Sequence, residues 1–436
     1  MLGSSVSIST RRRASGICAS LLVSTKMEPE HVSDSTPRTK KRRDVGIDQV
    51  MAFRVAAHHL DRRLSAGSML EAVGSCALQD SPPGSALLAL HARVNDVGPD
   101  VIDDGVEDRS LFHTWAMRGA PFFLPTADLA VFTAGVLPPG EEARRRFVLG
   151  IDPALDRLGM SLEEATDRTR SVVRDVLRNR RLAINELGTE LAQAIAVDLP
   201  TTTRRIWEAE GPYAKGQPLG EGVTHFCLRI LTLERVVCFA HRDGRKLPFV
   251  LVDEWLGDEP PGVDAGAARA ELARRYLRCY GPSSRADLAA WMGIARGDAT
   301  PWWQVIEDEI TTVHVDGRER WLLTEDLEAL RSPPDASGAR ILPPRDPLLQ
   351  LRDRESLVPD KKLHRRIWKT VGEPGTVLVD GRLAATWRPR KSGPKLSLTV
   401  EAFDTLTSRQ RKEIEAESEA VATLRGCSSV EVEFAS

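Results

Sequence analysis

Two clusters of basic side chains have a spacing suited to binding phosphate. In residues 168–181, Arg170, Arg174 and Arg178 recur every four residues and therefore share one face of a predicted helix. Residues 361–395 hold ten Lys or Arg against two acidic residues. Such clusters bind the phosphates of duplex DNA whatever its base sequence. The alternative is a solvated surface paired with neighbouring acids, and the sequence leaves both interpretations open for each cluster.

Any contact with DNA must come from such local surfaces, because the formal net charge of the 436-residue chain is only −2. Residues 388–395 combine basic residues with two prolines and a glycine, which predicts a mobile basic loop. The side chains that we expect to contact DNA in the two clusters are Arg170, Arg174, Arg178, Arg181, Arg388, Arg390 and Lys391.

Several other kinds of chemistry are not indicated. The sequence contains no glycine-rich phosphate loop, GxSxG elbow or HExxH motif. Its six cysteines are scattered, with no CxxC pair and no histidine at zinc spacing, so we expect free thiols in a reducing cytoplasm and neither disulfides nor a metal site. His58 and His59 are expected to be partly exposed at a helix end. No apolar run reaches the ~18 residues that a membrane span needs, so no contact with a membrane is expected.

The clearest predicted architecture lies in residues 267–324. Helices are expected over residues 267–280 and 285–292, and Thr300-Pro301 begins a third helix because proline is well accommodated at the first helical position. Two β-rich runs around Asp316-Gly317 then form a hairpin, since glycine supplies the positive φ of the turn. Three helices followed by a hairpin predict a winged helix.

The same order recurs twice more. The predicted elements are helices 161–178, 182–195 and 225–233 with a hairpin around Asp243-Gly244, and helices 47–60, 68–78 and 84–94 with strands 111–117 and 121–124. A β-rich region from residue 341 to 400 precedes a charged helix at 407–424. The predicted fold is α+β, with a disordered basic tail (1–46), three tandem winged-helix units (47–135, 136–258 and 265–332) and a β-rich subdomain with a C-terminal helix (340–425).

These units do not have the recognition helices of an operator-binding regulator. In a winged helix the third helix usually enters the major groove and is basic or polar. Here the third helix of the last unit, expected to reach Glu309, is acidic and aromatic, so phosphates would repel it. The corresponding helix 225–233 is almost wholly apolar, which predicts a core position.

Several phrases in the sequence resemble those of the AlkZ-type DNA glycosylases, in order from about residue 47 to 425. The resemblance implies three tandem winged helices around a concave channel for duplex DNA. It also implies monofunctional removal of alkylated purines or interstrand crosslinks without metal or organic cofactor. The phrases lie at residues 78–83, 114–119, 342–348, 379–382 and 386–388.

The catalytic tripeptide of that family, Gln-x-Gln or Gln-x-Asp, corresponds to residues 79–81. Two polar side chains at i and i+2 of an extended segment point the same way, so they can hold a water near C1′ of the sugar. The resemblance therefore assigns catalysis to Gln79 and Ser81, with Arg118 holding the DNA backbone. Ser81 stands where Gln or Asp is expected, and Phe122 stands where many members carry His. An alternative role is a capping turn, in which Ser81 or Asp80 caps a helix opened by Pro82 or Pro83.

Two functions follow from these features. The first is an AlkZ-like glycosylase that acts as a monomer on double-stranded DNA. The second is a catalytically inactive DNA-binding relative, a damage sensor or regulator, which the serine and phenylalanine favour. A third interpretation is a protein–protein module without affinity for duplex DNA. Both DNA functions require the arginines to converge on a groove that Gln79 can reach.

Overall fold

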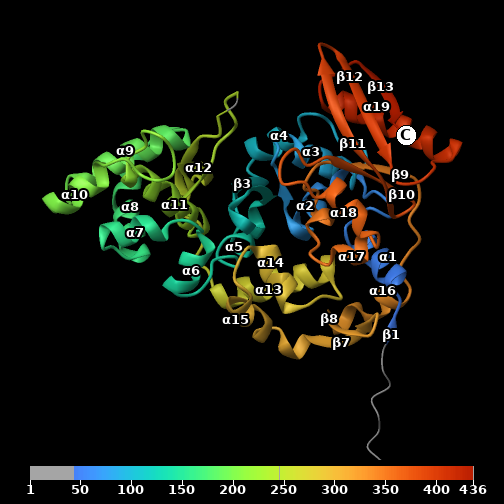
Figure 1. The fold of residues 1–436 in the computed structure, drawn as a ribbon, viewed down its shortest axis with the longest axis horizontal. Coiled ribbons are helices and arrows are strands. Elements are labelled where there is room, and N and C mark those ends of the chain that lie inside the picture. Colours follow the sequence, from blue (N-terminus) through green and yellow to red (C-terminus); the bar gives the residue numbers. More distant parts are fainter. Residues whose placement is uncertain (1–43, 245, 436) are drawn as a thin grey trace, which may run out of the picture. The chain divides into compact units, whose positions relative to one another are not determined.

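The computed structural model of the chain describes residues 44–244 and 246–435 (Figure 1). The described residues belong to one unit that begins at Arg42. Most of the predicted basic tail therefore lies outside the described residues. Its end forms strand β1 (Asp44–Val45), so the predicted boundary at residue 46 is slightly late. In this part of the chain, no helix has both the length and the apolar character needed to cross a bilayer.

The first segment builds a small antiparallel sheet in the order β2-β4-β3. Residue 78 was expected to end a helix, but α2 ends at Cys76 and Ala77 turns the chain with φ 58°. Leu78 and Gln79 instead pair with Phe123 and Phe122 of β4. The elements are α1 (Ile47–Ala57), α2 (Met69–Cys76), β2 (Leu78–Gln79), α3 (Ser85–His91), α4 (Val101–Glu107), β3 (Leu111–Trp115) and β4 (Pro121–Pro125).

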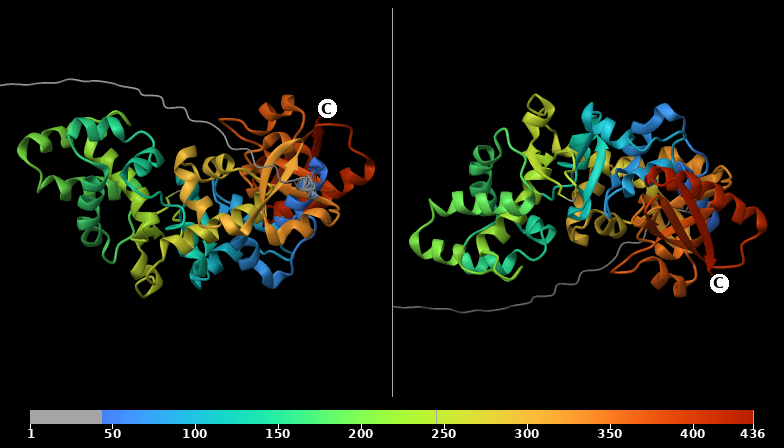
Figure 2. Two further views of the ribbon diagram at one scale, coloured as in Figure 1. Left: turned by 90° about the horizontal axis from the view of Figure 1, so that it is seen from below. Right: turned by 90° about the horizontal axis from the view of Figure 1, so that it is seen from above.

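The second segment is mostly helical, and Figure 2 shows its helices α7–α11 (green) grouped together from two further sides. Ser161 caps α8 by accepting a hydrogen bond from the Glu164 amide at 3.0 Å. Helix α11 begins earlier than predicted, because Gly220 leaves room for Trp207: a Cβ there would lie 2.1 Å from the indole. The elements are α5 (Leu129–Phe132), α6 (Glu141–Phe147), α7 (Asp152–Leu158), α8 (Leu162–Leu177), α9 (Ile184–Ala196), α10 (Thr201–Glu208), α11 (Leu219–Leu233), β5 (Val237–Phe239), β6 (Phe249–Leu251) and α12 (Val252–Leu256).

The third segment contains the three predicted helices and the hairpin. Ser284 caps α14, and Gly293 ends it in the left-handed conformation. The third helix ends at Gln304 instead of Glu309. Helix α1 packs on this hairpin, where Val50 and Phe53 share a core with Leu322, and β1 runs parallel to β7. The elements are α13 (Ala265–Tyr280), α14 (Arg285–Met292), α15 (Thr300–Gln304), β7 (Ile310–Val315), β8 (Arg318–Leu323) and α16 (Leu327–Arg331).

The C-terminal segment is a five-stranded sheet in the order β13-β12-β11-β10-β9, with α19 buried against it (Figure 1). The predicted mobile loop at residues 388–395 is wrong, because Arg388 pairs with Thr399 and Ser392 with Lys395 in a regular hairpin. Pro389 is tolerated because pairing with β10 ends at Trp387, which leaves one side of β11 open. The elements are β9 (Ala339–Leu342), α17 (Arg354–Leu357), α18 (Lys361–Ile367), β10 (Gly375–Val379), β11 (Arg382–Ser392), β12 (Lys395–Ala402), α19 (Ser408–Leu424) and β13 (Ser429–Ala435).

Candidate active site

Gln79 lies at the end of β2, and its side chain is held by an arginine from the turn between β3 and β4. Its Oε1 accepts a hydrogen bond of 3.1 Å from Nη2 of Arg118, whereas its Nε2 has no hydrogen-bond partner among the described residues. Gln79 is only 3% exposed, so it lies beneath the surface and not on an open groove. A buried amide donor without a partner is costly to maintain, which marks Nε2 as a group available to a ligand.

Arg118 is positioned by the turn between β3 and β4 and by the end of α14. Its backbone is in the left-handed region with φ 59°, and its Nη1 donates to the carbonyl of Trp291. Gly293 permits this contact, because a Cβ there would lie 2.9 Å from Cα of Arg118. The guanidinium therefore joins Gln79 to α14 in one fixed arrangement.

The surroundings of Arg118 are electropositive. Burial, together with the charges of Arg352 and Arg345, lowers the pKa of Arg118 to about 9. Arg352 forms no ion pair with a described carboxylate, and Nε of Arg345 lies 3.4 Å from the Glu373 carboxylate. Burial raises the pKa of Glu373. Arginines that are desolvated and close to one another gain strongly from an anion, so this arrangement suits phosphate.

Asp80 directly follows β2, and its side chain has different partners from that of Gln79. Its Oδ1 accepts hydrogen bonds from the amides of Gly84 (2.7 Å) and Ala86 (3.4 Å), and its Oδ2 lies 3.4 Å from Nη2 of Arg242. Burial raises the pKa of Asp80. Helix α3 starts at Ser85, after both prolines, and its N-cap residue is Gly84. The capping turn considered from the sequence is therefore wrong in its residues, although the Asp80 carboxylate binds two amides at the start of this helix.

Asp80 also lines a cavity of about 670 Å³ together with His113 and Arg242. His113 stacks on Phe123 with 4.0 Å between ring centroids, and its Nε2 has no partner among the described residues. Burial, with a smaller contribution from the charge of Arg242, lowers the pKa of His113 to about 3. His113 is therefore neutral at physiological pH, and no motif in the sequence singled it out.

The two departures from the family pattern lie close to Gln79. Ser81 is half-buried, and its hydroxyl forms no hydrogen bond with another described residue. Phe122 is buried, pairs with Gln79 across the sheet and lies 5.8 Å from the Arg118 guanidinium. The ring supplies an apolar wall where an imidazole would supply a proton carrier. Gln79 is therefore the polar member of the tripeptide that contacts Arg118.

The arginines at the end of α8 are paired with acids. Arg170 contacts Glu234 at 2.5 Å, Arg174 contacts Asp253 at 2.5 Å, and Arg178 contacts Asp175 at 2.8 Å. Arg181 instead lies over the Trp255 ring at 5.8 Å. None of these arginines contacts Gln79 or Arg118 within the described ranges. This geometry matches the alternative of a solvated, paired face.

The cations of the β11–β12 hairpin have a different environment. Nη2 of Arg388 donates to the Gly372 carbonyl at 2.8 Å, and Nζ of Lys391 donates to the Arg425 carbonyl at 2.9 Å. Arg390 is exposed. None of the three contacts a carboxylate within residues 44–244 and 246–435. Their charges are therefore available to an anion from outside.

Residue types alone did not identify Arg345 and Arg352 as neighbours of Arg118. Arg345 lies in the phrase at residues 342–348, which indicated only a family resemblance. The neighbouring Asp346 explains how that phrase is held: both of its oxygens accept 2.8 Å hydrogen bonds from Arg93 of the α3 segment. Both side chains of this ion pair are almost fully buried. The ion pair of Arg93 with Asp346 therefore fixes the segment that places Arg345 and Arg352 close to Arg118.

Comparisons with known proteins identify the family and the fold of the chain. The sequence model of a family described as "DNA glycosylase AlkZ-like" matches residues 70–424. A curated "Interstrand DNA cross-link repair glycosylase" from Streptomyces sahachiroi is 25% identical over 397 residues, which is 88% of this chain and 98% of that protein. The solved structure of Streptomyces sahachiroi DNA glycosylase AlkZ matches with a TM-score of 0.71 at 22% identity, over 90% of this chain and 100% of that one. The likeness to the solved structure shows the fold.

Proposed function

The chain belongs to the AlkZ-like DNA glycosylase family, and from this membership we propose that it hydrolyses the N-glycosidic bond of an alkylated or crosslinked base in duplex DNA. The observation that carries the proposal is the contact of the Gln79 amide with Arg118 beside Arg345 and Arg352. This cluster combines a polar group that can orient water with cations that can hold the flanking phosphates.

In the proposed reaction the oxygen of a water attacks C1′ as the bond between C1′ and the base nitrogen breaks. The electron pair of that bond goes to the base, and the attacking water passes one proton to the surrounding solvent as its oxygen becomes the hydroxyl on C1′. A purine alkylated at N7 carries a positive charge and leaves as a neutral molecule, so the reaction needs less acid–base assistance than hydrolysis of an ordinary nucleotide. Gln79 orients the water, and the Ser81 hydroxyl is a weak second ligand to it.

Because Gln79 is buried, we propose that DNA binding exposes its amide. A phosphate placed near Arg345 and Arg352 attracts the Arg118 guanidinium, which then exchanges Gln79 for the phosphate. That exchange frees Oε1 of Gln79 to accept a hydrogen bond from the water. It also joins the damaged nucleotide, turned out of the base stack, to the catalytic residue.

Duplex DNA is held, in this proposal, by the helix-and-hairpin units acting as winged helices and by Arg388, Arg390 and Lys391. Arg170, Arg174, Arg178 and Arg181 are proposed as further phosphate contacts of smaller effect, because most of them must first exchange an internal ion pair. The chain is proposed to act as a monomer, with no metal or organic cofactor in the reaction.

A duplex that contains a single 7-methylguanine separates this function from that of an inactive DNA-binding relative, which Ser81 and Phe122 favour. Incubation with the full chain should release the free base and leave a site that alkali cleaves. Duplex binding with no release after many hours would support the inactive relative. No binding even at about 50 mM salt, where phosphate contacts are strong, would support a protein–protein module.

A further inference from the structure

Three side chains that bind soft metal ions meet in the interior next to the candidate active site. His58 directly follows α1, Cys76 ends α2, and Cys279 lies in the last turn of α13. Their ligand atoms all lie within 4.8 Å of one another, and Sγ of Cys76 is 3.8 Å from Nδ1 of His58. The prediction of a partly exposed His58 is wrong: all three residues are at most 3% exposed, and helix packing joins them from distant parts of the sequence.

We propose that His58, Cys76 and Cys279 form a structural zinc site. Tetrahedral zinc holds sulfur at about 2.3 Å and nitrogen at about 2.0 Å, which requires its ligand atoms to lie roughly 3.5–3.8 Å apart. The cluster is already near that size, so small side-chain rotations would complete the site. Two thiolates, one neutral imidazole and a divalent ion carry no net charge, which suits a buried position. Thiolate ligands also select zinc over magnesium or calcium.

The hydrogen bonding of His58 fits this role. A neutral imidazole has one N–H group and one lone pair, yet Nε2 of His58 has no partner among the described residues. The polar contact that Nδ1 makes is with Sγ of Cys76. The ring also stands edge-on to Tyr280, with 5.1 Å between centroids. The His58 ring is thus held in one orientation. The contact of its Nδ1 is with a thiol and not with a hydroxyl or N–H group, so its lone pair can pass to a metal ion.

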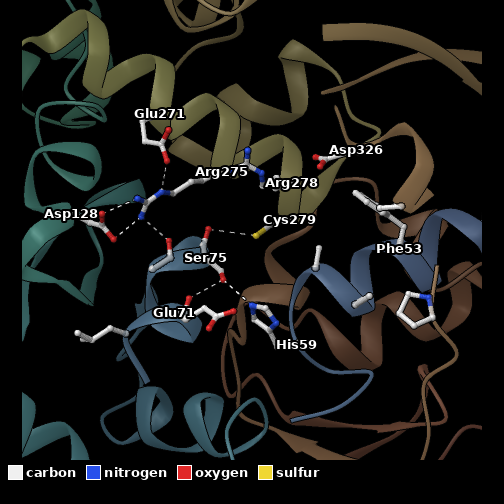
Figure 3. Close-up of a pocket in the computed structure, with 16 residues that line it drawn as sticks. Phe53, His59, Glu71, Ser75, Asp128, Glu271, Arg275, Arg278, Cys279 and Asp326 are labelled. Carbon is white, nitrogen blue, oxygen red and sulfur yellow. Dashed lines mark hydrogen bonds and ion pairs between the residues drawn. The ribbon is translucent and has the colours of Figure 1, made fainter. Parts of the chain in front are cut away.

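A cavity reaches one member of this cluster, Cys279. Figure 3 shows Cys279 directed at Ser75 along the wall of a cavity of about 620 Å³, with His59 and Glu71 nearby. Sγ of Cys279 lies 3.5 Å from the Ser75 carbonyl oxygen. A water from the cavity can therefore supply the fourth ligand, beside three from the protein.

The site would fix the backbone that carries Gln79. Cys76 lies three residues before Gln79, and the sharp turn at Ala77 lies between α2 and β2. A zinc ion bound by both Cys76 and Cys279 would attach this turn to α13. Tyr280, the residue after Cys279, packs on Trp291 with 5.7 Å between ring centroids. Trp291 is in turn the residue that Arg118 contacts. Zinc binding itself is independent of the proposed reaction, and only its effect on Gln79 rests on that function.

Metal analysis of the full chain tests the proposal without any activity assay. Protein purified under reducing conditions, without chelators or a metal-affinity step, should contain about one equivalent of zinc. After the zinc is removed anaerobically, Co²⁺ should give the visible bands of a tetrahedral site and the near-ultraviolet band of thiolate ligation. Cys76→Ser and Cys279→Ser should each weaken zinc binding by more than about 100-fold, beyond the usual effect of losing an outer-shell partner.

Cys227→Ser is the matched control, because Cys227 is equally buried but belongs to no such cluster among the described residues. It should leave zinc content and the Co²⁺ spectrum unchanged. Wild-type protein that binds Co²⁺ only with the spectrum of exposed, octahedral sites would overturn the proposal, and this result does not depend on whether the variants fold. A disulfide between Cys76 and Cys279 in protein isolated under argon would overturn it as well.

Discussion

Nη2 of Arg118 donates a hydrogen bond of 3.1 Å to Oε1 of Gln79, although Gln79 ends β2 and Arg118 lies in the turn between β3 and β4. Arg118 also donates to Trp291, so its guanidinium links the sheet to α14. Two donors of one planar group thus serve two acceptors at once. Lysine lacks this fork, which makes the arrangement testable by a substitution that keeps the charge.

Arg118→Lys should slow base release. In the proposed reaction the guanidinium has exchanged Gln79 for a phosphate while it still donates to the Trp291 carbonyl, and lysine cannot reproduce both contacts. Losing one charge-assisted hydrogen bond costs about 1.5–3 kcal/mol, which corresponds to a roughly 10- to 150-fold lower rate constant. Single-turnover kinetics with enzyme in excess over the methylated duplex measure this rate. Arg285→Lys, at an exposed position of α14, is the control and should react like the wild type. Equal rates for both variants would remove Arg118 from the mechanism.

Ser81→Asp should accelerate base release. Aspartate restores a family-like partner beside Gln79 and supplies a carboxylate to orient and polarise the water, an effect that typically contributes 100-fold or more, so a gain of at least about tenfold is expected. Ser81→Ala should stay within a few-fold of the wild type, because the hydroxyl is a weak ligand. The assignment of the tripeptide to water positioning fails if the aspartate variant is no faster than the serine form.

Arg390→Ala should weaken duplex binding and reduce its dependence on salt. Each lost phosphate contact lowers the slope of log K against log [salt] by about 0.9, because one fewer counterion is released. Fluorescence anisotropy with an undamaged duplex at several salt concentrations gives the slope. Arg331→Ala is the control, since Arg331 is paired with Glu328 on α16. A salt slope identical to wild type for Arg390→Ala would exclude the hairpin from the DNA interface.

His113→Phe should make the fold less sensitive to acid. The unfolded chain protonates this histidine near its ordinary pKa of 6.5, whereas folded His113 stays neutral down to about 3. Unfolding therefore takes up a proton between these values, and the free energy of unfolding falls as the pH drops below about 6.5. This contribution amounts to about 2 kcal/mol between pH 7 and pH 5. Urea titrations at both values should show a smaller loss in the variant, and an equal loss would contradict the assignment.

Local signals predicted much of the architecture. The helix at residues 285–292 has its predicted bounds because Ser284 and Gly293, a cap and a terminator, act within one turn of the chain. The Asp316-Gly317 hairpin follows from the same kind of short-range signal. Gln79 and Arg118 were reached through the family resemblance, and the structure adds that they touch.

Long-range pairing explains what the sequence missed. Leu78 suits a helix as well as a strand. It becomes part of a strand because it pairs with β4, which comes later in the chain, after α4 and β3. Residues 388–395 have a loop-like composition, yet β12 supplies a regular partner strand. The ion pairs of the α8 arginines with Glu234 and Asp253 also come from later segments. His58, Cys76 and Cys279 likewise become neighbours only when three helices pack.

The most direct test of the account is the single-turnover rate of 7-methylguanine release by Gln79→Ala, measured at saturating enzyme together with the affinity for the same duplex. Gln193→Ala, an exposed position on α9, is the matched control. The account predicts a rate at least about 100-fold below wild type for Gln79→Ala with duplex affinity unchanged, and full activity for the control. Release by Gln79→Ala at the wild-type rate would contradict the assignment of catalysis to this glutamine.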